Sequence, residues 1–217
     1  MKKIAITFGA TMLFAAVASA QSYAVQNNSF ELPAQPGMGS YDSTGFPGWS
    51  HSGGADWGSW WIPDGGFITI GAPDGNQIGY MNGGSVAQQL SGGLVVGTTT
   101  VSAYGLTRND GLSGIFELEL WAGGTVSAGV VSGGTMLTST LYTPGALNSA
   151  ALVSASYSAS ASDALLGQTL SVEITQVGGV SQSDFDDVHV FATPEPSTMM
   201  VGCFGLTGLI LRRRARR

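Results

Sequence analysis

Cysteine is almost absent from this sequence, and histidine is scarce. The one cysteine, Cys203, lies in an apolar run near the C-terminus, so the rest of the chain has no disulfide to form and no thiol nucleophile. The two histidines, His51 and His189, fall in no G-x-S-x-G, H-E-x-x-H or comparable motif. The common motifs of cysteine- and histidine-dependent enzymes are therefore excluded, and stability has to come from a buried core, with or without a metal ion.

Positive charge is rare between the two ends of the chain. Arg108 is the one cation in residues 21–196, which contain all fourteen acids, so one positive and fourteen negative charges give a net charge of −13. Binding to phosphates depends mainly on lysine and arginine. The composition argues against a nucleic-acid partner, and it favours a soluble body that attracts divalent cations.

A sustained helical period is also missing between the ends, apart from a single turn expected near Asp163. Glycine pairs punctuate the chain instead, and glycine suits hairpin turns because it reaches positive φ without steric cost. Alternating or β-branched runs between these pairs predict strands at residues 67–70, 76–81, 85–90, 98–104, 114–121, 125–131, 135–142, 168–177 and 184–191, with a weakly packed strand within 146–164. The pattern predicts an all-β fold of antiparallel strands.

The segment FELELW, residues 116–121, shows the clearest alternation. Phe116, Leu118 and Leu120 share one face, which we expect to be buried. Glu117 and Glu119 share the other, which we expect to be solvated, with about 7 Å between them along the strand, a spacing found in inverting glycosidases. Surface acids on a solvated strand show the same pattern, so a catalytic role would require a cleft with another carboxyl group.

The first twenty residues have the layout of an export signal. Lys2 and Lys3 precede an apolar run, and Ala18-Ser19-Ala20 is the small-x-small pattern that signal peptidase accepts. The apolar run is too short for a resident membrane helix. We expect residues 1–20 to be a signal peptide that the general export machinery uses and signal peptidase removes.

The C-terminal segment, residues 194–217, has three parts. They are the triad Pro194, Glu195 and Pro196, an apolar run at 198–211 expected to form a short helix, and a cluster that includes Arg212, Arg213 and Arg214. A fourteen-residue helix spans about 21 Å, less than the roughly 30 Å hydrocarbon core of a bilayer. The arginines would hold the tail on the cytoplasmic side.

This ending resembles the PEP-CTERM sorting signal of Gram-negative bacteria. The resemblance implies transient membrane anchoring, recognition by an exosortase-type membrane protease, and delivery of the body to the outer surface or extracellular matrix. Proteins with this signal are typically associated with exopolysaccharide and biofilm. An ordinary membrane anchor is the alternative, but it would not explain the triad.

Three short motifs in the body carry a second resemblance. VQNNSFELP at 25–33, GFPGW at 45–49 and SDFDDVHVF at 183–191 resemble, in this order, the galactose-binding-like jelly-roll domains that include carbohydrate-binding modules. The resemblance implies a jelly-roll β-sandwich for residues 21–193. It also implies a structural calcium ion between the first and last strands, with Glu31 and Asp186 or Asp187 among its ligands, and such carboxylates suit Ca²⁺. Solvent-facing or turn-capping acids are the alternative.

Tryptophans gather in WSHSGGADWGSWW, residues 49–61. Indoles stack on the apolar faces of sugar rings, so Trp57, Trp60 and Trp61, with Asp56 and Asp64, predict a glycan-binding patch. Trp49 is expected in the core. Alternation along a strand allows only one of Trp60 and Trp61 to face solvent.

The sequence thus predicts an exported, non-catalytic surface or matrix protein that binds extracellular polysaccharide. A structural biofilm-matrix component without glycan binding is one alternative, and a glycan-active enzyme is another. Binding requires the tryptophans to be partly exposed and concave, whereas a structural role requires them to be buried.

Overall fold

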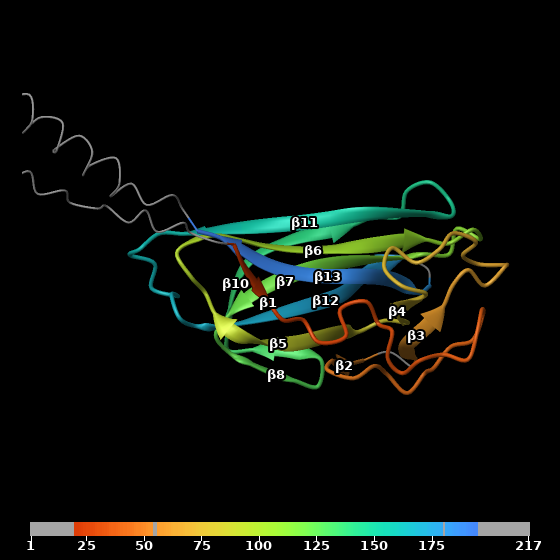
Figure 1. The fold of residues 1–217 in the computed structure, drawn as a ribbon, viewed down its shortest axis with the longest axis horizontal. Coiled ribbons are helices and arrows are strands. Elements are labelled where there is room, and N and C mark those ends of the chain that lie inside the picture. The colour runs from red at the N-terminus through yellow and green to blue at the C-terminus, as the bar shows by residue number, and fades with distance from the viewer. Residues whose placement is uncertain (1–19, 54–55, 180, 195–217) are drawn as a thin grey trace, which may run out of the picture. The chain divides into compact units, whose positions relative to one another are not determined.

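The computed structural model describes residues 20–53, 56–179 and 181–194, and every regular element in this part of the chain is a β-strand (Figure 1). The strands are β1 (Gln21–Tyr23), β2 (Ser50–Ser52), β3 (Trp57–Trp61), β4 (Gln77–Met81), β5 (Ser85–Gly93), β6 (Gly97–Thr107), β7 (Gly114–Ala122), β8 (Thr125–Ser127), β9 (Val130–Ser132), β10 (Thr135–Tyr142), β11 (Ser149–Ala159), β12 (Thr169–Gly179) and β13 (Ser183–Thr193). No helix of the described residues is long and apolar enough to cross a membrane. The predicted signal peptide, except Ala20, and the sorting segment after Pro194, including its expected helix, lie outside the described residues.

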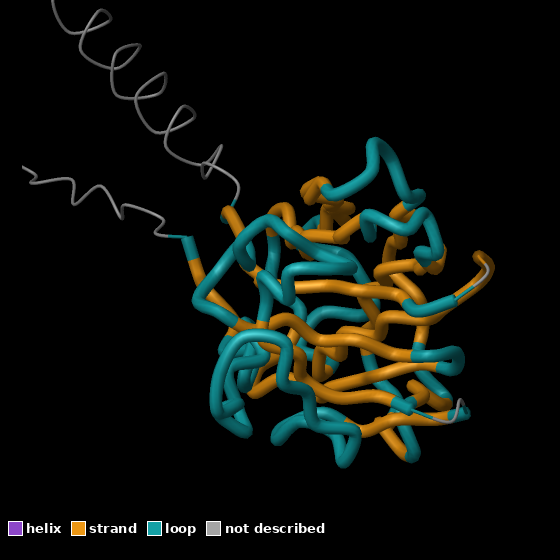
Figure 2. The backbone as a smooth tube through the Cα atoms, turned by 90° about the vertical axis from the view of Figure 1, so that its right-hand side faces the viewer, coloured by secondary structure: helices purple, strands orange, loops and turns teal. Residues whose placement is uncertain are grey.

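Two antiparallel sheets face each other. One has the strand order β11-β6-β13-β4-β3, with β1 paired to β13, and the other has the order β10-β7-β12-β5-β2. The predicted antiparallel β-sandwich is confirmed, and Figure 2 shows its strands joined by loops at the end that carries β3 and β4. Gln21 pairs with Ala192, so the described chain begins and ends at the same, opposite end of the sandwich (Figure 1).

Most of the predicted strands are present, but residues 125–131 divide into the two short strands β8 and β9, and residues 67–70 form a loop. The physical reason is Asp64, whose Oδ1 accepts backbone hydrogen bonds from Gly66, Phe67 and Ile68 at 2.9–3.0 Å and so closes the chain into a turn. The single turn expected near Asp163 forms, with Leu166 N donating to Asp163 O.

The centre of the core is an aromatic cluster. Phe30 packs edge-on against Phe46 and Phe185, with ring centroids 4.7 and 5.1 Å apart. Trp49 is buried beside them, as expected, and its indole N–H donates to Gln26 O. Gly79 has to be glycine, because an added Cβ would come within 2.6 Å of the Phe185 ring.

A second apolar cluster lies on the outer face of the β11-β6-β13-β4-β3 sheet. The residues that form it are Trp60, Ile62, Ile68, Ile78, Tyr80 and Leu106. Its existence explains why β4 is buried on both faces: Gly79 and Met81 face the main core, while Ile78 and Tyr80 face this cluster. The loop that follows β3 covers this second apolar cluster.

The β8–β9 hairpin lies over the outer face of the other sheet. Gly129 O accepts a hydrogen bond from Ser85 Oγ, and Val131 N donates to Glu173 Oε2. Phe116, Leu118 and Leu120 are fully buried in the core, as predicted, but the opposite face of β7 is not uniformly solvated, because Glu119 is buried. That part of the prediction was wrong because alternation within one strand does not show that Glu173 of β12 and the Trp121 side chain lie against Glu119.

Candidate functional site

A cavity opens beside the second apolar cluster. Its volume is about 180 Å³, and it is lined by Tyr41, Asp56, Trp60, Phe67, Tyr80, Arg108 and Gln182. We call it the Trp60 cavity. It is smaller than the roughly 300–1,000 Å³ of clefts that hold drug-sized ligands, so it suits a single small ring.

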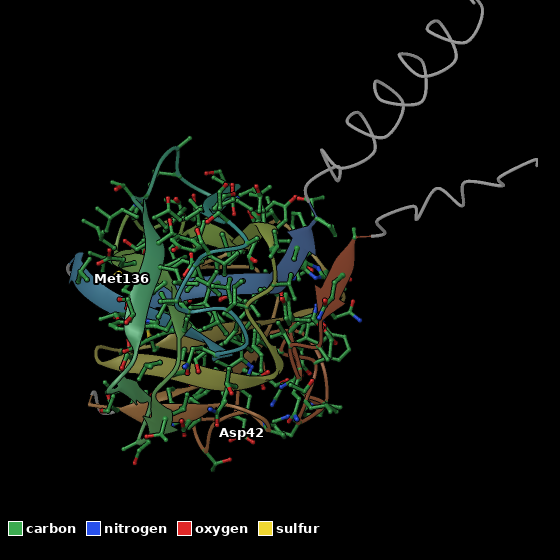
Figure 3. All side chains as sticks on the ribbon, turned by 90° about the vertical axis from the view of Figure 1, so that its left-hand side faces the viewer. Asp42 and Met136 are labelled. Atoms are coloured by element: carbon green, nitrogen blue, oxygen red, sulfur yellow. The ribbon has the colours of Figure 1, made fainter. Side chains whose placement is uncertain are left out.

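The segment 39–42 brings Tyr41 to the cavity by extending the sheet beyond β3. Asp42 N donates to Ser59 O, and Trp61 N donates to Ser40 O, both at 2.9 Å. Gly58 permits this approach, because a Cβ at that position would collide with Asp42 O. Tyr41 is 65% exposed, and its ring meets that of Tyr80 edge-on at 6.5 Å. Figure 3 shows Asp42 far from Met136, which lies on β10 at another edge of the domain.

Arg108, the one cation of this part of the chain, follows β6 directly and lies in the cavity wall. Its guanidinium is 4.4 Å from the centroid of Phe67 and 5.9 Å from that of Trp60. Its Nε and Nη2 donate to the two carboxylate oxygens of Asp110 at 3.2 and 2.8 Å. The hydrogen bond from Arg108 lowers the pKa of Asp110, so the two charges form a closed pair.

The opposite wall, around Tyr80 and Asp56, is electronegative. Burial and, next in importance, the carboxylate of Asp56 raise the pKa of the Tyr80 phenol. Asp56 is half-buried, and its carboxylate makes no hydrogen bond to another described residue.

Asp184 lies at the start of β13, directly across from Tyr80 on β4 and Leu106 on β6. It is fully buried, and burial raises its pKa to about 7. Gln182, which lines the cavity, donates from Nε2 to Asp184 Oδ1, whereas Oδ2 has no partner among the described residues.

The predicted tryptophan patch is divided between the two faces of β3. Trp60, 7% exposed, and Asp56 line the Trp60 cavity. Trp57 packs against Phe46 and stacks on His51, and with Trp49 it lines a shallower depression of about 390 Å³. Trp61 lines neither of these cavities.

Asp64 does not line the cavity either; it acts through the loop that positions Phe67. Sequence reasoning missed Tyr41, Tyr80 and Gln182, which carry no motif. It also missed Arg108 as a site residue, although its isolation as the one cation of the body was a usable signal.

Of the predicted calcium ligands, Glu31 and Asp186 reach the same loop, residues 74–77. Glu31 Oε1 accepts hydrogen bonds from Asn76 N and Gln77 N at 2.7 Å, and Asp186 Oδ2 accepts one from Asp74 N at 2.9 Å. Asp187, at a β-bulge with φ of 51°, pairs instead with His189 at 2.6 Å. The described residues contain no group of three acidic, histidine or cysteine side chains placed to hold a metal ion.

Glu119 has a carboxylate neighbour on the adjacent strand. It lies directly opposite Glu173 in the ladder between β7 and β12, and both are buried. Glu173 also accepts a hydrogen bond from Val131 N of the β8–β9 hairpin. Trp121 Nε1 donates to Glu119 Oε2 at 2.8 Å. Neither glutamate lines the Trp60 cavity or the Trp57 depression, so the geometry gives no support to a glycosidase pair.

Comparison with known protein families identifies the family to which the chain belongs. The family model described as HpiC1 cyclase matches residues 21–191. The chain belongs to the HpiC1-like family. Residues 192–217 match the PEP-CTERM protein-sorting motif, which confirms the predicted signal and marks the protein as an exported substrate of an exosortase. Comparison with curated proteins finds no match.

Solved cyclases share the fold. The Stig cyclase Fisc from Fischerella sp. TAU, in complex with (3Z)-3-(1-methyl-2-pyrrolidinylidene)-3H-indole, superposes with a TM-score of 0.67 and 20% identity, covering 81% of this chain and 99% of that one. An apo cyclase from Fischerella sp. gives 0.67 and 20%, covering 82% and 98%. A cyclase from Fischerella sp. TAU with 4-(1H-Indol-3-yl)butan-2-one gives 0.65 and 18%, covering 81% and 99%. At this identity the likeness establishes the fold alone.

The buried glutamate pair predicts how stability depends on pH. Burial raises the pKa of Glu119, and the charge of Glu173 raises it further. A carboxyl group whose pKa is higher in the folded state stabilises the fold at low pH, and this contribution is lost as the pH rises through the folded-state pKa. We expect Glu119→Gln to match the wild type at acidic pH and to exceed it by about 1 kcal/mol at pH 8 in urea unfolding.

Glu117→Gln, on the same face of the same strand but half-buried, is the matched control and should keep most of the pH dependence, because the Glu117 charge raises the pKa of Glu119 less than burial and Glu173 do. Equal pH profiles for Glu119→Gln and the wild type would contradict the prediction.

Proposed function

We propose that this exported protein binds extracellular polysaccharide at the Trp60 cavity, one sugar ring at a time. The observation that carries the proposal is the cavity itself, in which the rings of Tyr41, Trp60 and Tyr80 meet the polar groups of Asp56 and Gln182. Aromatic faces accept the apolar C–H faces of a sugar, and a few polar groups fix its orientation. The protein then acts as a surface or biofilm-matrix component without catalysis.

The position of the cavity supports this function. Gln182 directly precedes β13, a strand of eleven residues that is about 35 Å long, and the sorting segment follows the other end of that strand. A chain held through its C-terminus therefore keeps the cavity at the far end of the domain from the point of attachment.

The test is calorimetric titration of the full chain, in detergent micelles, with oligosaccharides from the producing bacterium's matrix. Tyr41→Ala should weaken binding about tenfold, because it removes one ring of the cavity. Tyr41 is largely exposed, so the variant should stay folded. Leu152→Ala, at a comparably exposed apolar residue on β11, is the control and should bind like the wild type. Absence of binding by the folded wild type would leave the matrix component without glycan binding as the better description.

Cyclisation of an unsaturated substrate is a second candidate function. It is favoured by the match to the HpiC1 cyclase family and by the buried carboxyl group of Asp184. Burial raises the pKa of Asp184 to about 7, so a large share of this carboxyl group is protonated near neutral pH, which suits general acid catalysis. Asp184 would donate a proton to one double bond of the substrate, a second double bond of the same molecule would attack the resulting cation, and loss of a proton to the carboxylate would restore the acid. Gln182 links this acid to the cavity.

For this second function, we expect incubation with an indole that bears an unsaturated side chain to give a cyclic isomer of unchanged mass. Asp184→Asn should lower the rate at least about a hundredfold. Glu117→Gln, remote from the cavity, should retain the wild-type rate. No isomer with the folded wild type, measured by NMR over a day, would remove cyclisation of such indoles.

We also propose that calcium reinforces the connection that loop 74–77 makes between Glu31 and Asp186. Burial raises the pKa of Asp186 to about 8, and the neighbouring acids Asp187 and Asp74 add to the rise, so a cation would relieve the cost of ionising it. The ion would hold the segment that follows β1 to the last strand, β13, and take no part in ligand binding.

Calcium chloride should raise the melting temperature of the full chain above its value in chelator, because a ligand of the folded state stabilises it. Glu31→Gln should abolish this difference, and Glu117→Gln should keep it. Identical melting temperatures with calcium and with chelator would contradict calcium binding.

A further inference from the structure

Of the two charged side chains that line the Trp60 cavity, Asp56 is available to bind a ligand and Arg108 is not. Both Nε and Nη2 of Arg108 are directed to Asp110, and its guanidinium covers the faces of Phe67 and Trp60. Asp110 therefore neutralises the positive wall. Asp56, on the other wall, has no cationic partner among the described residues, because Arg108 is the one lysine or arginine in residues 21–196.

The wider surroundings make this wall more negative. Asp42 lies beside Tyr80, whose hydroxyl donates to Asp42 O at 3.2 Å, and Asp184 lies across from Tyr80 on the next strand. These carboxylates, with Asp56, contribute to the raised pKa of the Tyr80 phenol, after burial. The body as a whole carries one cation against fourteen acids, so its long-range field attracts cations and repels anions.

We infer that the Trp60 cavity prefers a sugar ring that carries a protonated amine to a neutral or acidic ring. This inference rests on the proposed sugar binding and names the class of sugar. An ammonium group offers three donors, forms a charge-assisted hydrogen bond with a carboxylate such as Asp56, and is attracted to the ring faces of Tyr41 and Tyr80. A uronic acid would place its carboxylate against the unpaired Asp56.

A metal ion does not fit the same place. Calcium needs six to eight oxygen ligands, whereas the cavity wall is mainly aromatic. An organic cation uses the aromatic surface and the Asp56 carboxylate together.

The test compares three probes of equal length: a glucosamine hexamer, the N-acetylglucosamine hexamer and a glucuronic acid hexamer. Each is titrated calorimetrically into the full chain in detergent micelles at about pH 6, where the amines are protonated. We expect the glucosamine hexamer to bind about tenfold more tightly than the acetylated one, and the acidic hexamer to bind most weakly.

Asp56→Asn should bring the affinities of the glucosamine and acetylated hexamers within about twofold of each other, since it removes the charge and keeps the shape. Glu117→Gln changes the net charge by the same amount on the other sheet and should keep the tenfold preference. Circular dichroism establishes that both variants are folded.

The outcomes distinguish failure of the amine preference from failure of sugar binding itself. Equal binding of the three hexamers by the wild type, or tighter binding of the acidic one, would overturn the amine preference and leave sugar binding intact. Loss of the preference for the glucosamine hexamer in Glu117→Gln as well would also overturn the inference, because the preference would then be caused by the net charge of the protein and not by Asp56. Binding of none of the three hexamers, combined with no binding of the matrix oligosaccharides, would remove the sugar-binding function itself.

Discussion

The packing of Phe185 against Phe30 is the contact on which the rest of the structure depends. It joins the last strand to the N-terminal segment, and Phe46 closes the cluster from the GFPGW turn. The room for it comes from Gly79, the partner of Phe185 on β4, where any side chain would meet both rings. Three motifs far apart in the sequence are therefore parts of one aromatic core.

The same strand connects this core to the candidate site. Residues of a strand alternate between its two faces, so Phe185 points into the core while Asp184, beside it, points to the outer cluster with Tyr80 and Leu106. The core thus fixes the register that puts Asp184 and Gln182 under the cavity. A bulge at Asp187 then shifts the alternation, so that Val188 returns to the core and the strand can pair with β1 near its end.

Local patterns predicted the strands and the core, but not the surface that forms where segments meet. Alternation in FELELW predicted the buried Phe116, Leu118 and Leu120, because period-2 burial is a property of one strand. It failed for Glu119, which is buried beside Glu173 of the neighbouring strand and accepts a hydrogen bond from the Trp121 indole. It failed again at 67–70, where Asp64 organises a loop. Part of the cavity lining was predicted. Trp60 and Asp56 were predicted from the tryptophan-rich segment, whereas Tyr41 and Gln182 reach the cavity only because segments far apart in the sequence pair in the fold.

The distribution of charge also reflects where the chain goes. A sorting signal rich in arginine ends the sequence, while the body before it retains a single arginine that is bound to Asp110 and two aromatic rings. Such a body has almost no free positive charge with which to hold anionic polymers, so long-range attraction favours cationic ligands. Because the field of the whole domain and the unpaired Asp56 act in the same direction, selectivity at the cavity requires no second charged residue. Binding strength and charge preference are then set by different residues, the aromatic rings and Asp56, and can be separated by mutation.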